Sequence, residues 1–153
     1  MASLRALQLP PTPEPDFLHL HYQPDLRTLA ARWQRPVSPS EFRQGYLAAL
    51  AAAEAAACRF WLVDLRARTA PAPAEARWLT TRLLPLLPGR LGGTTYLGML
   101  LSPQFVVPPA PPYPVVLGTS APAPGVIVRS FDLEGPLIGW LARCQRPASP
   151  PVS

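Results

Sequence analysis

The residues best suited to chemistry lie in one short stretch, "DLRART", at positions 64–69. It holds the carboxylate of Asp64, the guanidinium groups of Arg66 and Arg68 and the hydroxyl of Thr69, directly after the apolar run 60–63. Such a run followed by an acid is typical of a buried strand that ends at the carboxyl edge of an α/β sheet, where ligands and partners bind. We therefore predict a partner- or ligand-binding site at Asp64, Arg66, Arg68 and Thr69.

For Asp64 and for Thr69, a purely structural interpretation also stays open. Asp64 can form an ion pair with Arg66 or Arg68 that only fixes the turn, and structural ion pairs are common at such positions. Thr69 is a possible phosphorylation site, because a phosphate just before a helix would meet free backbone N–H groups and nearby arginines. The alternative is an ordinary threonine of a surface loop.

Other chemistries find less support in the residues. His19 and His21 share one face of a predicted strand, but a zinc site needs three or four ligands and the chain offers no third histidine and no paired cysteines. Cys58 lies at the end of a predicted helix with no histidine expected beside it, and the chain has no G-x-S-x-G motif or phosphate-binding glycine loop. We predict that the protein is not an enzyme and uses no metal or cofactor.

The composition limits the partners. A chain of 153 residues with 48% apolar and 15% charged residues has the size and core of one domain. Its net charge of +5 comes from arginines spread along the chain rather than gathered in one run, which argues against nucleic-acid binding. No apolar run reaches the length of a membrane span, roughly 18 residues. The two cysteines, Cys58 and Cys144, form no C-x-x-C pattern, so we expect a cytoplasmic protein without a membrane span.

The apolar pattern predicts alternating strands and helices. Five strands are expected, at 17–22, 27–33, 59–65, 94–101 and 126–131. The first two form a hairpin across the turn signal "QPDL". Residues 1–16 are predicted as a proline-rich extension, 103–124 as a long proline-rich loop, and 146–153 as a disordered tail, which leaves one domain at 17–145.

The first helix has the clearest signals. Ser38 is predicted as its N-cap, Pro39 as its first residue and Glu41 as the partner that completes a capping box. Val37 can then pack against Phe42, and the inner face continues through Tyr46, Leu50, Ala53 and Ala57 at helical spacing.

Two more helices follow along the chain. One opens at Pro73, with an inner face that includes Trp78, Leu79, Leu83 and Leu86, and Pro85 is expected to kink it or end it early. The last is expected to be capped by Asp132, with Leu137, Trp140, Leu141 and Cys144 on its inner face. The order predicts an α/β fold: a single-layer mixed sheet of about five strands, flanked by about three helices and starting with a β-hairpin.

This order and a few residues resemble a known family. An initial hairpin ending in a tryptophan, a Ser-capped "EF" helix, a strand ending in Asp-x-Arg and a tryptophan in the next helix are similar to STAS-like (SpoIIAA-like) bacterial domains, over residues 17–145. The matching residues are Trp33, Ser38, Glu41, Phe42, Trp61, Asp64, Arg66, Trp78 and Trp140. Phospho-regulated members carry a serine at the start of the helix after the central strand, whereas this loop has only Thr69.

The resemblance implies a regulatory rather than a catalytic function. We expect a protein-interaction domain that docks an unidentified protein partner through the loop after the central strand. STAS-like domains are close in topology to lipid-carrying CRAL-TRIO domains, so the alternative is a domain that binds a small apolar ligand or lipid, with the loop 103–124 as a lid.

Overall fold

The computed structural model describes residues 15–103 and 119–146. Nearly all of the predicted tail, nearly all of the predicted N-terminal extension and most of the proline-rich loop lie outside the described residues. No helix in the described ranges is long and apolar enough to cross a membrane.

The sheet has six strands in the spatial order β1-β2-β3-β4-β6-β5. Their bounds are β1 Leu18–Gln23, β2 Thr28–Trp33, β3 Phe60–Asp64, β4 Thr95–Leu100, β5 Thr119–Ala123 and β6 Val126–Phe131. β2, β3, β4 and β6 run parallel, while β1 and β5 pair antiparallel at the two edges. The predicted mixed α/β sheet that starts with a hairpin is therefore confirmed, with one strand more than expected.

The additional strand, β5, lies inside the segment 103–124 that the prolines indicated as loop. It pairs with β6 alone, and its register shifts between Ser120 and Ala123. Pro122 is compatible with this position because an edge strand has one side that makes no ladder hydrogen bonds. Proline content alone therefore could not separate an edge strand from a loop.

The first helix, α1 (Pro39–Ala56), begins as its sequence indicates. The hydroxyl of Ser38 accepts from the amide of Glu41 at 3.2 Å, and the Glu41 carboxylate accepts from the amide of Ser38 at 2.9 Å. The helix ends at Ala57, which adopts the left-handed conformation with φ 50°. Ala57 is therefore exposed rather than part of the inner face, a correction to the prediction.

The second helical region is continuous but irregular. It runs through α2 (Pro73–Trp78), a π-helical turn η2 (Leu79–Leu83), a 3-10 turn η3 (Leu84–Leu86) and α3 (Leu87–Leu91). The irregular turns surround Pro85, which lacks the N–H of a regular helix. They change the face that meets the sheet: Leu86, expected inside, is 43% exposed, while Leu84 and Leu87 are buried.

The last helix, α4 (Glu134–Gln145), begins two residues after the expected cap. Its N-cap is Leu133, with no side-chain hydrogen bond, and Asp132 is exposed outside the helix, so the predicted cap is wrong. The expected inner face is confirmed: Leu137, Trp140 and Leu141 are buried and Cys144 packs against them.

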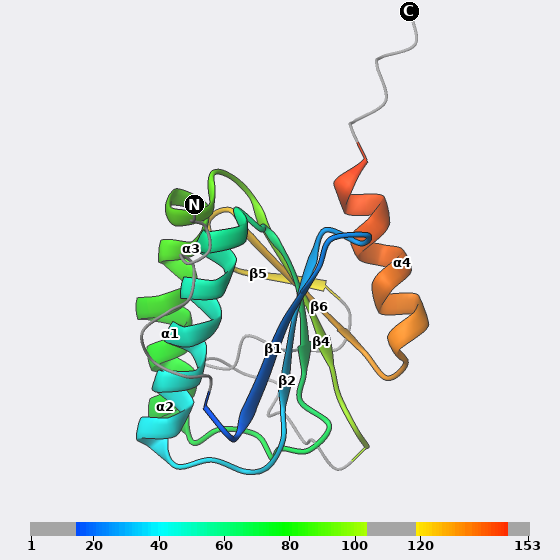
Figure 1. Ribbon diagram of the computed structural model, residues 1–153. Helices are drawn as coiled ribbons and strands as arrows, with labels where there is room; N and C mark the ends of the chain where they lie inside the picture. The colour runs from blue at the N-terminus through cyan, green and yellow to red at the C-terminus, as the bar shows by residue number, and fades with distance from the viewer. Residues whose placement is uncertain (1–14, 104–118, 147–153) are drawn as a thin grey trace, which may run out of the picture.

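The helices divide unequally between the two faces of the sheet. α1, α2 and α3 cover one face and α4 alone covers the other (Figure 1). Successive residues of β3 alternate between them: Trp61 and Val63 pack under α1, while Leu62 packs under α4. Asp64 shares the α4 side with Leu62 by this alternation.

Candidate functional site

Asp64 ends β3 with a side chain that is only 9% exposed and fully engaged in hydrogen bonds. Its Oδ1 accepts from the backbone amide of Arg66 at 3.1 Å and from Arg66 Nε at 3.0 Å. Its Oδ2 accepts from Arg66 Nη2 at 2.8 Å and from Arg32 Nη1 at 3.0 Å. The carboxylate thus fixes the turn that follows the strand and ties β3 to β2.

Arg32 extends this arrangement to the start of α4. Its Cα lies opposite that of Asp64 in the β2–β3 register, and its guanidinium forms a two-pronged pair with Glu134, at 2.9 Å and 3.0 Å. Arg66 Nη2 lies 4.0 Å from the same carboxylate. We call these four residues, Arg32, Asp64, Arg66 and Glu134, the carboxyl-edge network.

Arg32, Asp64 and Arg66 are stabilised in their ionised forms, as the directions of their pKa shifts indicate. Burial by itself would raise the pKa of Asp64, but the hydrogen bonds from Arg66 and Arg32 outweigh it and hold the pKa below its usual value. The hydrogen bond to Asp64 in turn raises the pKa of Arg66. A carboxylate held ionised in this way is poorly suited to acid–base catalysis near neutral pH, because a catalytic acid or base needs a pKa close to the working pH.

Arg68 turns to the opposite face of the sheet and does not join the network. Its side chain is buried at 6% exposure, and its guanidinium carbon lies 4.5 Å from the ring centre of Trp33 and 4.9 Å from that of Phe42. Burial lowers the pKa of Arg68, and no carboxylate of the described ranges pairs with it. The geometry indicates a cation–π contact that holds the loop against α1.

Thr69 is exposed in the loop between β3 and α2. The N-cap of α2 is Ala72, three residues later, and makes no side-chain hydrogen bond. Of the predicted site residues, the structure therefore brings together Asp64 and Arg66, places Arg68 on the other face and leaves Thr69 on the surface. Its phosphorylation stays a prediction.

Sequence reasoning missed Arg32 and Glu134. Arg32 lies 32 residues from Asp64 along the chain, and Glu134 lies 102 residues from Arg32. The only signal for Arg32 was a charged residue inside the apolar run 28–33. It also missed Leu133, which precedes Glu134 and is 62% exposed, more than any other large hydrophobic residue of the described ranges. We call Leu133 and the half-exposed Arg66 the carboxyl-edge surface.

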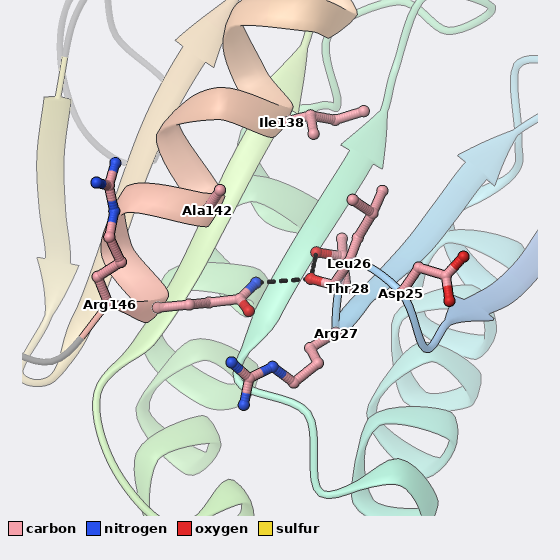
Figure 2. Close-up of a pocket in the computed structure, with 8 residues that line it drawn as sticks. Asp25, Leu26, Arg27, Thr28, Ile138, Ala142 and Arg146 are labelled. Carbon is pink, nitrogen blue, oxygen red and sulfur yellow. Dashed lines mark hydrogen bonds between the residues drawn. The ribbon is translucent and has the colours of Figure 1, made fainter.

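A separate pocket of about 280 Å³ lies between the turn of the β1–β2 hairpin and the last turns of α4 (Figure 2). Its lining mixes apolar side chains with charged and amide groups, so it does not favour the lipid alternative. His19 and His21 are exposed on β1, and no group of three or more metal-ligating side chains occurs within residues 15–103 and 119–146.

Comparisons of the chain with family models, with curated proteins and with solved structures found no match.

Proposed function

We propose that this protein is a non-catalytic regulatory domain of STAS-like type that docks a protein partner at its carboxyl-edge surface. The observation that carries the proposal is the contrast between Asp64, whose carboxylate is held by four hydrogen bonds, and Leu133, which directly precedes Glu134 of the same network and is 62% exposed. The carboxyl-edge network forms a rigid support, and the carboxyl-edge surface presents an exposed apolar side chain and a half-exposed arginine next to it. Protein-interaction surfaces combine groups of these kinds.

The partner follows from the chemistry of this surface. Arg66 still presents half of its side chain to solvent after pairing with Asp64, and arginine is enriched in interfaces because its flat guanidinium binds carboxylates in a defined geometry. Leu133 supplies the apolar contact. We infer a protein segment that presents an apolar side chain next to a carboxylate.

The state of Cys58 also supports a non-catalytic function. Its thiol is buried, donates to the carbonyl oxygen of Phe60 at 3.1 Å, and has a pKa raised by that burial. A protonated, buried thiol is a poor nucleophile.

The test compares three forms of the full chain as bait in affinity capture: wild type, Leu133→Ser and Leu47→Ser. Serine is a favoured N-cap residue, so the first substitution keeps or improves the start of α4. Leu47, 50% exposed on α1, is the matched control on the other side of the sheet. We expect Leu133→Ser to lose a partner that wild type and Leu47→Ser both retain.

The double variant Leu133→Ser/Arg66→Ala sharpens the assignment. It removes both exposed groups of the carboxyl-edge surface, and circular dichroism checks that it remains folded. A partner list identical to that of wild type would reject the proposal.

A further inference from the structure

The pocket lies at the C-terminal end of α4, whereas the carboxyl-edge network lies at its N-terminal end. Two elements line the pocket, α4 and the turn of the β1–β2 hairpin. Ile138, Ala142 and Gln145 line it from α4, at the spacing of one helix face, and the hairpin turn supplies Leu26 and Arg27. Figure 2 shows Ile138 and Ala142 on the side of α4 that faces the strands of the sheet and the hairpin turn. The side-chain amide of Gln145 donates to the carbonyl oxygen of Leu26 at 2.8 Å, which fixes the distance between the two walls.

The backbone at Arg27 is strained. The turn is closed by hydrogen bonds from the amides of Leu26 and Arg27 to the carbonyls of Gln23 and Pro24, and Arg27 has φ 48°. Glycine and asparagine adopt this left-handed conformation readily, whereas other residues do so at a cost in stability. Residues with strained backbone persist where the surrounding structure holds them, and they are concentrated at functional positions.

The charges favour an anion. The lining includes the charged residues Arg27, Arg146 and Asp25. In Figure 2 the guanidinium of Arg146 points away from the hairpin turn. In Figure 2, Arg27 extends from the turn toward the end of α4, while the carboxylate of Asp25 points away from that helix. Arg27 is thus the charged side chain of the lining that reaches between the two walls. A single guanidinium matches a monoanion better than a dianion, and guanidinium groups bind carboxylates through paired hydrogen bonds.

We propose that this pocket binds a small monocarboxylate with a short apolar body. Arg27 binds the carboxylate, and Leu26, Ile138 and Ala142 contact the apolar part. The volume of about 280 Å³ is at the lower limit for ligand pockets and fits a molecule of the size of benzoate or isovalerate. The site is independent of the carboxyl-edge surface, so either proposal can fail without the other.

The test is a titration of the isotope-labelled protein, as the full chain, with benzoate. Binding is measured from the amide chemical shifts in nuclear magnetic resonance spectra. We expect saturable shifts at residues 25–28 and 142–146, with a dissociation constant of roughly 1 mM, as small ligands of this size reach. Benzyl alcohol, which lacks the charge, and choline, which reverses it, should bind at least about tenfold more weakly. Equal binding of benzyl alcohol, or no saturation with benzoate, would overturn the proposal.

Arg27→Gly separates binding from folding. Glycine tolerates φ 48°, so this variant should unfold at the same temperature as wild type or a higher one, yet bind benzoate at least about tenfold more weakly. Ala142→Phe should block the pocket, and Arg82→Ala, an exposed arginine on η2, is the matched control that should bind as wild type. Unchanged binding by Arg27→Gly would contradict the assignment.

Discussion

The two faces of the sheet differ in how their side chains are used. The face under α1, α2 and α3 holds a continuous core that includes a cluster of four aromatic rings in mutual contact, those of Phe17, Trp33, Phe42 and Tyr46. The face under α4 has a smaller apolar cluster in the described residues, whose buried members are Leu62, Leu100, Leu137, Trp140 and Leu141. Both candidate sites lie at the ends of α4. The comparison indicates that the larger core lies under α1, α2 and α3, and that the surface and the pocket for which we propose binding both lie on the thinly covered face.

The largest expected effect comes from a matched pair on one strand. Leu97 and Leu100 are both fully buried on β4 but face opposite sides, Leu97 the α1 side and Leu100 the α4 side. Leu97→Ala should lower the free energy of unfolding by about 4 kcal/mol, and Leu100→Ala by about 3 kcal/mol, because a single helix can settle more easily into the cavity. Urea denaturation measures both, and a larger loss for Leu100→Ala would break the comparison.

Two glycines test how tightly each face is packed. A methyl group at Gly45 would overlap Cη2 of Trp33, inside the aromatic cluster, and one at Gly98 would lie 2.6 Å from Cγ of Leu137. Both substitutions to alanine overfill the core. Gly45→Ala should cost about 3 kcal/mol and Gly98→Ala about 1–2 kcal/mol, because α4 can shift outward while the tryptophan is held by rings on several sides. Equal thermal shifts for the two variants would show equally rigid faces.

Asp64→Ala tests the carboxyl-edge network. It removes an acceptor of four hydrogen bonds from charged or backbone donors, and the expected loss is about 2 kcal/mol of unfolding free energy. Glu54→Ala is the control, since it breaks only the exposed pair with Arg90 and should cost less than about 1 kcal/mol. A loss at Asp64 no greater than at Glu54 would mean that the network does not stabilise the fold.

The same network predicts a dependence on pH. Because the pKa of Asp64 is lower in the folded than in the unfolded chain, its stabilising contribution is complete above the unfolded pKa of about 3.9. The contribution is lost as the pH falls through the folded pKa. Unfolding measured between neutral pH and acid should therefore show wild type losing stability below about pH 4, with a shallower loss for Asp64→Ala. Parallel curves would contradict this role.

Local signals predicted the elements well where short-range physics decides. The capping box at Ser38 and Glu41 forms as its spacing indicates, because all its atoms lie within one helical turn. The cap of α4 was wrong because Asp132 carries the same local signal but lies one residue before the N-cap, Leu133. The next residue, Glu134, has its carboxylate bound by Arg32, a partner that no local pattern reveals.

The site was predictable only in part for the same reason. Asp64 and Arg66 are two residues apart, so their pairing follows from the turn. Arg32 meets Asp64 only through the parallel register of β2 and β3, which depends on the whole sheet. Arg68 could not be assigned to a face because, past the end of the strand, side chains no longer alternate.

The measurement that tests the comparison most directly is hydrogen exchange of the native protein, resolved by residue. Local opening should cost less free energy in α4 than in α1, because α4 is held by a small apolar cluster, the carboxyl-edge network and the hydrogen bond from Gln145 to Leu26, whereas α1 packs on the larger core. We expect the buried amides of α4 to exchange through a partial opening that leaves α1 protected. Exchange of both helices at one common opening free energy would contradict the division of the molecule into a stabilising and a binding face.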